Sequence, residues 1–210
     1  MRPDAIRPPT SHERMSGRPW DASYYDGPAP WDVGRPQPAV ARLASEGGFT
    51  GAVLDAGCGT GENSLLVAAL GLPMLGVDVA ETALSMAREK AAERAVPAEF
   101  AWADALRLER LGRRFDTILD CGLFHTFDGD ERLRYVASLA SVTDRDGTLY
   151  VLCFSDDGPD TGPHPVNREE LRAAFSAGNG WLITTLEADR VHTTYHDDGA
   201  PGWFATIKRI

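Results

Sequence analysis

Short apolar runs alternate along this chain with segments whose apolar residues recur at helical spacing. The apolar runs are expected to form buried strands at 52–56, 74–77, 99–102, 115–119 and 148–154. The segments between them are expected to form helices at 62–70, 81–94, 130–141 and 167–175. Two final extended runs, 181–187 and 203–209, lie close enough in sequence to pair antiparallel. Because strands that alternate with helices favour right-handed crossovers, we predict an α/β, doubly wound, mostly parallel seven-stranded sheet with an antiparallel C-terminal hairpin strand.

The chain before the first strand divides into two parts. Residues 1–19 are polar and rich in proline, with too little apolar surface to order themselves, and are expected to form a flexible tail. Residues 20–40 carry Trp20, Tyr24, Tyr25 and Trp31 among prolines and glycines. Aromatic residues on such an arm cannot build a core of their own, so we expect the arm to dock on the body as a lid. A single domain is expected over 20–210, since one core serves up to about 250 residues.

The charge balance and the cysteines exclude several classes of protein. With 31 acidic and 21 basic side chains the net charge is −10, which repels a phosphate backbone, so no nucleic-acid partner is expected. No apolar stretch approaches the roughly 20 residues of a membrane span, so no membrane partner is expected either. The three cysteines have no CxxC spacing, which disfavours disulfides or structural zinc and favours the cytoplasm. His192 and His196 lie about 13 Å apart on an expected strand, so no metal site is predicted.

A bend rich in glycine follows the first expected strand. Its three glycines, within 57–61, allow positive φ and let a ligand approach the backbone closely. Asp78, Asp104 and Asp120 each stand at the carboxyl end of an expected strand, and parallel strands present these ends at one rim of the sheet. The spacing G-x-G-x-G is one residue tighter than the dinucleotide fingerprint, which disfavours an NAD-dependent oxidoreductase. We therefore predict a ligand site at this rim, where Asp78 accepts hydrogen bonds from a ribose diol; a tight turn that binds nothing is the alternative.

Four segments resemble, in order, the motifs of class I S-adenosylmethionine-dependent methyltransferases: VLDAGCGTG at 53–61, Gly76-Val77-Asp78, Ala103-Asp104-Ala105, and Phe115-Asp116 through Asp120. The likeness spans residues 50–155 and implies the Rossmann-like methyltransferase fold, with S-adenosylmethionine as cosubstrate. It implies that Asp55 and the backbone of Gly57, Cys58 and Gly59 hold the methionine moiety. It further implies a cofactor contact at Val79, ribose binding by Asp78, adenine binding by Asp104 and Ala105, and a border with the sulfonium and the acceptor at Asp120, Cys121 and Leu123.

The arm carries a second resemblance. The segment YYDGPAPWDVGRPQP at 24–38 is similar to the one before the first strand in thiopurine, thiol and halide methyltransferases and in bacterial relatives that methylate small heterocyclic toxins. In that group the arm closes over the cofactor, and a tryptophan corresponding to Trp31 packs near it. Methyl transfer from a sulfonium disperses positive charge, so a water-poor site with aromatic faces favours it. We hypothesise that Tyr24, Tyr25 and Trp31 close the site and that Leu123 and Phe124 lie beside the acceptor.

Two side chains in the loop after the fourth expected strand are candidates for chemistry. His125 is the candidate catalytic residue, as a general base that deprotonates an O–H or N–H nucleophile. The alternative is a structural role, in which His125 caps the next helix or binds a backbone carbonyl. Cys121 is not expected to act as a nucleophile, because no histidine or aspartate that would activate it is evident in the sequence.

These observations favour one function and leave others open. We expect an enzyme that transfers a methyl group from S-adenosylmethionine to an O, N or S nucleophile of a small aromatic or heterocyclic molecule. A thiol or halide methyltransferase is the first alternative. A non-catalytic module that binds S-adenosylmethionine and regulates a partner is an alternative of another class. The identity of the acceptor and the oligomeric state do not follow from the sequence.

Overall fold

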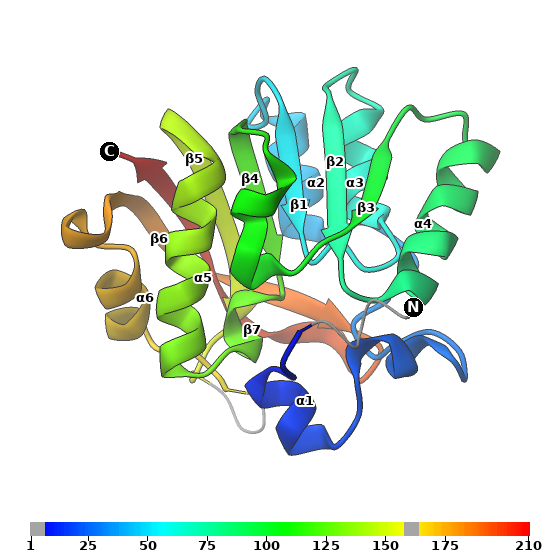
Figure 1. Cartoon of the computed structure of the whole chain (residues 1–210), viewed down its shortest axis with the longest axis horizontal. Helices are drawn as coiled ribbons and strands as arrows, with labels where there is room; N and C mark the ends of the chain where they lie inside the picture. The colour runs from blue at the N-terminus through cyan, green and yellow to red at the C-terminus, as the bar shows by residue number, and fades with distance from the viewer. Residues whose placement is uncertain (1–6, 158–163) are drawn as a thin grey trace.

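A seven-stranded sheet forms the centre of the computed structural model, which describes residues 7–157 and 164–210 of the 210-residue chain. The strands lie in the order β3-β2-β1-β4-β5-β7-β6 (Figure 1). Their bounds are β1 Val53–Ala56, β2 Met74–Asp78, β3 Glu99–Trp102, β4 Phe115–Cys121, β5 Thr143–Phe154, β6 Trp181–Thr193 and β7 His196–Arg209. The first five strands pair in parallel, whereas β7 is antiparallel to both β5 and β6, so the predicted sheet and its C-terminal hairpin are confirmed.

Helices cover both faces of the sheet (Figure 1). One face carries α2 (Pro38–Ser45), α3 (Glu62–Ala68) and α4 (Glu81–Glu93), and the other carries α5 (Gly129–Val142) and α6 (Arg168–Ala174). Successive strand residues point to opposite faces. Ile118 and Leu149 therefore pack with α5 and α6, while Leu119 and Tyr150 pack with α2 and α3. Among the helices of the described ranges, none is long and apolar enough to cross a membrane.

Local sequence signals set the ends of several elements. The side chain of Asp128 accepts the Glu131 N–H at the start of α5, and Asn167 accepts the Glu170 N–H at the start of α6, so a capping box forms at the start of each helix. Gly61 precedes α3 with a φ of +83°, and a Cβ there would lie 2.9 Å from Ala87 Cβ on α4. Only glycine therefore allows α3 and α4 to pack this closely. Short 3₁₀ helices occupy Trp20–Tyr24, Ala105–Leu111, Phe124–Thr126 and Ala177–Asn179.

The C-terminal hairpin is longer than its apolar pattern predicts. We expected strands at 181–187 and 203–209, but the ladder between β6 and β7 continues through 188–202 to a tip at Thr193–His196. The tip is attached to the arm, because the Thr194 N–H donates to the Pro30 carbonyl oxygen at 2.8 Å. Hydrogen bonds to a distant segment thus extend the strands where hydrophobic alternation ends.

Residues 10–13 are packed against the body, in contrast to the flexible tail predicted for residues 1–19, whereas residues 14–19 are exposed; residues 1–6 lie outside the described residues. Helix α1 (Ser11–Ser16) begins after Thr10, whose side chain and Glu13 form a reciprocal capping box. The Ser11 N–H and hydroxyl both donate to the Glu131 carboxylate on α5. The expectation failed because it considered apolar surface alone, whereas buried polar contacts order this segment.

Candidate active site

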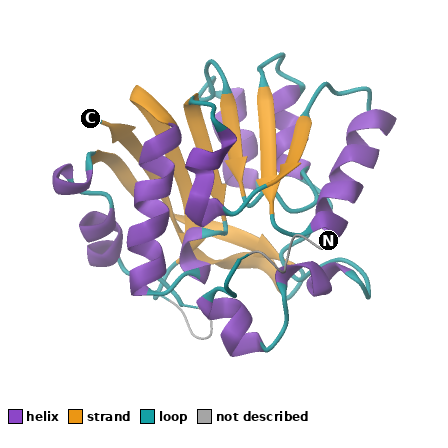
Figure 2. Ribbon diagram, viewed as in Figure 1, coloured by secondary structure: helices purple, strands orange, loops and turns teal. Residues whose placement is uncertain are grey.

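One cavity of about 390 Å³ opens beyond the carboxyl ends of the parallel strands. Figure 2 shows these ends on one side of the sheet, with α1 and the long C-terminal hairpin beside them. Three parts of the chain line the cavity: the glycine bend with the strand ends, the N-terminal segment, and the hairpin tip. The predicted site residues that line it are Tyr24, Trp31, Gly57, Cys58, Gly59, Asp78, Val79, Asp104, Ala105, Cys121, Leu123 and His125. The rim predicted from the sequence is therefore the wall of a cavity.

Asp78, at the end of β2, faces this cavity with part of its hydrogen-bonding capacity unused. Its Oδ2 accepts the Gly59 N–H at 2.8 Å and its Oδ1 accepts the Ala80 N–H at 2.9 Å. Burial raises the pKa of Asp78, whereas the hydrogen bonds from backbone N–H groups and the charge of Arg7 lower it in part. A carboxylate has about four acceptor positions, and the Val79 backbone N–H also bonds to this one, so part of the capacity remains for the hydroxyl groups of a ligand. This arrangement fits a ribose diol.

Backbone N–H groups of the glycine bend are engaged within the protein. The N–H groups of Gly57 and Cys58 both donate to the Val77 carbonyl oxygen, at 2.8 Å and 3.0 Å. The third N–H of the bend, that of Gly59, donates to Asp78. These three donors are therefore not free to bind a pyrophosphate.

Asp55 and Asp120 lie behind the cavity wall and do not line it. Asp55 is 1% exposed and its Oδ2 accepts the Ser64 hydroxyl at 2.6 Å. The Oδ1 of Asp120 accepts the N–H groups of Leu123 and Phe124, and burial raises the pKa of Asp120 to about 6. These two carboxyl groups position the bend and the loop after β4, in contrast to the direct contacts that the resemblance implies.

The wild-type protein is expected to lose stability as the pH rises, and Asp55→Asn is expected to abolish this dependence. Burial raises the pKa of Asp55 to about 7 despite the hydrogen bond from Ser64, and the charges of Asp120 and Asp78 act in the same direction. In the unfolded chain this carboxyl group ionises near its ordinary pKa of 3.8. The folded state therefore retains a proton that the unfolded state releases, and the free energy of unfolding falls as pH rises from about 4 to about 7.

Urea unfolding of both proteins at pH values below and above this window measures the effect. Asparagine does not titrate, so the curve of Asp55→Asn should be the flatter of the two. Asp130→Asn, at an exposed position on α5, is the matched control and should keep the wild-type dependence. An unaltered pH dependence in Asp55→Asn would show that Asp55 does not cause the loss.

The aromatic residues of the arm divide into two groups. Tyr24 is buried against Ala80 and Ala83, and its hydroxyl accepts the Trp31 indole N–H at 2.9 Å, so both rings are fixed at the cavity. Tyr25 is 58% exposed, donates its hydroxyl to Asp21 and does not line the cavity. The proposed closing role of Tyr25 is therefore not supported. Consecutive residues of this 3₁₀ turn point in different directions, which composition alone does not reveal.

The loop after β4 likewise brings one of its two predicted acceptor-side residues to the cavity. Leu123 lines the wall beside the glycine bend. Phe124 is fully buried in the main core, with its ring 5.3 Å from that of Phe175 on the α6 side, and lies away from the cavity. Burial raises the pKa of the Cys121 thiol far above its ordinary value, and the nearby carboxyl groups add to this, so Cys121 is a poor nucleophile.

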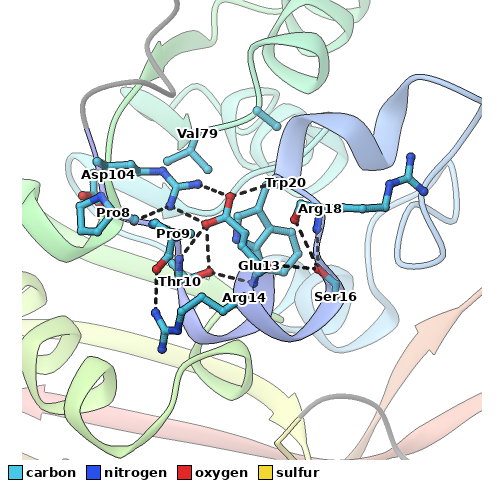
Figure 3. A network of polar contacts seen from close by, with 12 residues as sticks. Pro8, Pro9, Thr10, Glu13, Arg14, Ser16, Arg18, Trp20, Val79 and Asp104 are labelled. Carbon is cyan, nitrogen blue, oxygen red and sulfur yellow. Dashed lines mark hydrogen bonds and ion pairs between the residues drawn. The ribbon is translucent and has the colours of Figure 1, made fainter.

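The N-terminal segment supplies three cavity residues that the sequence did not identify, Arg7, Thr10 and His12, beside Trp20 of the predicted arm. Glu13 holds Arg7, Thr10 and Trp20 in place, because its carboxylate accepts two hydrogen bonds from Arg7, two from Thr10 and one from the Trp20 N–H (Figure 3). Figure 3 also shows Val79 and Asp104 of the strand ends beside this network. The T-x-x-E spacing at 10–13 is a capping signal that could have predicted the helix, though not its contacts.

The hairpin tip supplies a further wall. The Gln37 side chain donates to the His192 carbonyl oxygen and accepts the His192 N–H, each at 2.8 Å, and so attaches the tip to the start of α2. Residues 191–193, 195 and 196 then face the cavity. The His196 ring bonds to the Thr193 hydroxyl at 2.8 Å. In the part of the chain that the structure describes, no three His, Cys, Asp or Glu side chains are placed to hold a metal ion.

His125 lies in the cavity wall but does not have the properties of a base. It is 4% exposed, and its Nδ1 accepts the Phe154 N–H at 3.4 Å. Burial lowers the pKa of His125 to about 3, and the charge of Arg132 contributes. The lone pair that would take a proton is engaged, and the ring binds protons weakly. The structure therefore favours another role for this residue.

Comparisons with known proteins agree with this geometry. A family model described as a methyltransferase domain matches residues 53–147. A 2-heptyl-1-hydroxyquinolin-4(1H)-one methyltransferase of Mycobacteroides abscessus is 35% identical over 178 residues, which cover 81% of this chain and 78% of the relative. The chain belongs to the S-adenosylmethionine-dependent methyltransferases.

Two solved structures are similar to this chain in fold. One, from work on the conversion of a disulfide bond into a thioacetal group during echinomycin biosynthesis, is 35% identical and has a TM-score of 0.78, with coverage of 86% of this chain and 84% of the other. A Burkholderia thailandensis 1,6-didemethyltoxoflavin-N1-methyltransferase with bound S-adenosylhomocysteine shares the fold, with a TM-score of 0.74, 23% identity and coverage of 97% and 92%. The Rossmann-like methyltransferase fold and S-adenosylmethionine as cosubstrate are thus confirmed.

Proposed function

We propose that this methyltransferase acts on an O, N or S nucleophile of a small aromatic or heterocyclic molecule. The aromatic rings in the cavity wall carry the proposal: those of His12, Trp20, His125, Phe154 and Tyr195 all line the cavity. Flat apolar walls with few polar groups suit a flat ring system. The hydroxyquinolinone acceptor in the name of the Mycobacteroides abscessus relative supports the same class.

Some cavity residues would hold the methyl donor, and others would exclude water from it. Asp78 and Asp104 would bind the nucleoside, and the carbonyl groups of the glycine bend would bind the ammonium group. When bound, S-adenosylmethionine supplies an electrophilic methyl group on a sulfonium. The aromatic faces of Tyr24 and Trp31 stabilise positive charge by about 0.5–2 kcal/mol each where they approach it. Fixing the acceptor in line with the methyl group then accounts for much of the rate.

A thiol acceptor is a second candidate. His125, the predicted base, has its Nδ1 engaged by Phe154, and thiols ionise with little help near neutral pH. A thiolate therefore needs no proton acceptor on the protein.

Titration calorimetry with S-adenosylhomocysteine, followed by methylation assays on a panel of hydroxyquinolinones, phenols and thiols, tests the proposal. We expect micromolar-range binding and a methylated product with at least one heterocycle. Binding without any product would favour the non-catalytic regulatory module. Failure to bind at millimolar concentration would overturn the function as a whole.

A further inference from the structure

The hydrogen bond between Phe154 and His125 fixes which ring nitrogen carries the proton. A backbone N–H is always a donor, so the Nδ1 that accepts it from Phe154 must carry a lone pair. A neutral imidazole has one N–H, which is then at Nε2. His125 lines the cavity at 4% exposure, and its Nε2 makes no hydrogen bond within the described residues. The site thus contains an N–H donor that has no partner among residues 7–157 and 164–210.

The surroundings of this ring keep it neutral. Burial has the largest effect on the pKa of His125, and the charges of Arg132 on α5, His12 on α1 and His164 before α6 all disfavour the imidazolium. Arg132 is held in place by Glu170 at 3.0 Å and by the His164 carbonyl oxygen at 3.0 Å. The ring therefore remains an uncharged donor throughout the pH range in which weakly acidic heterocycles ionise.

We propose that His125 donates its Nε2–H to an oxygen or ring nitrogen of the acceptor, and that the acceptor is an acidic hydroxy-heterocycle methylated as its delocalised anion. This inference rests on the proposed function and specifies its substrate class. A delocalised anion presents two electron-rich atoms. One accepts the hydrogen bond from His125, which orients the ring, and the other faces the methyl group.

The reaction then needs no base on the protein. The acceptor loses its O–H proton to water before it binds. A lone pair of the bound oxyanion forms the new O–C bond while the C–S bond of S-adenosylmethionine breaks and its electron pair stays on sulfur. The charges of the anion and the sulfonium cancel, so a neutral ether and a neutral sulfide leave the site.

The protonation state can be measured without turnover. In ¹⁵N-histidine-labelled protein, NMR should show His125 as the Nε2–H tautomer from about pH 5 to about pH 9, since an unshifted histidine would titrate near 6.5. The signal is assigned by its absence from His125→Gln. Titration of this ring near neutral pH, or an Nδ1–H tautomer, would overturn the proposal.

Two substitutions distinguish hydrogen-bond donation by His125 from the shape of its ring. Activity is measured with 1-hydroxyquinolin-4(1H)-one as acceptor. His125→Phe keeps an aromatic ring but has no donor, and kcat/KM should fall about 10- to 100-fold, the range for a lost hydrogen bond to a charged group. His125→Gln offers an amide N–H at a similar reach and should retain more activity than the phenylalanine variant. Equal losses in both variants, or none, would contradict donation. Unchanged affinity for S-adenosylhomocysteine shows that each variant has an intact donor site.

The pH profile distinguishes an acceptor that ionises in solution from a base on the protein. With the parent compound and a ring-halogenated derivative of lower O–H pKa, the midpoint of the rise in kcat/KM should follow the acceptor's pKa. A protein base would give one midpoint for both acceptors. His12 is another imidazole of the cavity wall, and His12→Gln should leave both midpoints unchanged. A midpoint common to both acceptors would refute the inference, and so would a midpoint that His12→Gln moves. If the wild-type protein methylates neither acceptor, the proposed function on which the inference rests is refuted instead.

Discussion

Asp78→Ala is expected to weaken the binding of S-adenosylhomocysteine about a hundredfold or more. A hydrogen bond to a charged group contributes about 1.5–3 kcal/mol, and the acceptor capacity that Asp78 has left suits ribose hydroxyls. The same carboxylate accepts the Gly59 and Ala80 N–H groups, so its loss also releases the glycine bend from the end of β2. Titration calorimetry measures the affinity, and circular dichroism checks the fold.

Two further variants show whether this loss comes from the nucleoside contact. Asp104→Ala removes a cavity carboxylate whose one hydrogen bond within the described chain caps the turn at Leu106, so its effect should be smaller. Asp78→Glu keeps the charge and should recover part of the affinity. Equal affinity in the wild type and Asp78→Ala would remove Asp78 from the binding site.

Glu13→Ala is expected to detach the N-terminal segment and open the cavity. The side chains of Arg7 and Glu13 are only 7% and 4% exposed, and they form two hydrogen bonds of 2.6 Å. Removing one partner of a buried ion pair costs about 3–5 kcal/mol, because the remaining charge is left uncompensated. The loss should appear as fast hydrogen exchange and proteolysis within residues 7–24 and as at least a tenfold weaker affinity for S-adenosylhomocysteine, since Arg7, Thr10 and Trp20 line its cavity.

The pH dependence of this contact has a definite sign. Burial opposes ionisation of Glu13, but the hydrogen bonds from Arg7 and Thr10 outweigh it and lower its pKa below the ordinary 4.5. Because the folded state favours the ionised carboxylate, Glu13 stabilises the closed segment at pH values above 4.5. This stabilisation disappears as the pH falls through the lower pKa that Glu13 has in the folded state. Glu46→Gln, on the exposed end of α2, is the control and should bind S-adenosylhomocysteine like the wild type. Wild-type exchange rates in Glu13→Ala would refute this role.

Hydrophobic periodicity predicted the sheet, its helices and the rim, because each of these depends on neighbours in sequence. It also placed Asp78, which ends its strand, at the rim where the cavity lies. Asp55 differs because it lies within β1 rather than after it, so its side chain turns to Ser64 under the bend. Contacts between distant segments could not be predicted: Gln37 with His192, and Ser11 with Glu131, join positions more than a hundred residues apart.

The flexible tail predicted for residues 1–19 was wrong for the same reason, because long-range contacts order residues 10–13. Polar side chains such as Glu13 and Arg7 usually indicate solvent exposure, and no local pattern shows that they pair with each other under a helix. Tyr24 and Tyr25 are adjacent and chemically identical, yet one is buried and the other is exposed. Residue type indicates which chemistry a site can perform, whereas three-dimensional packing decides which of two residues of the same type lies in the site.

The attachment of the hairpin tip to Pro30 and Gln37 has a consequence for how acceptor preference changes in evolution. The glycine bend and the strand ends of the cavity wall come from residues 57–125, whereas another part of the wall comes from residues 7–37 and 191–196. Because these last two segments touch, a substitution in one requires a matching substitution in the other. A change of acceptor preference through this part of the wall therefore needs paired substitutions, and selection acts on the two segments together.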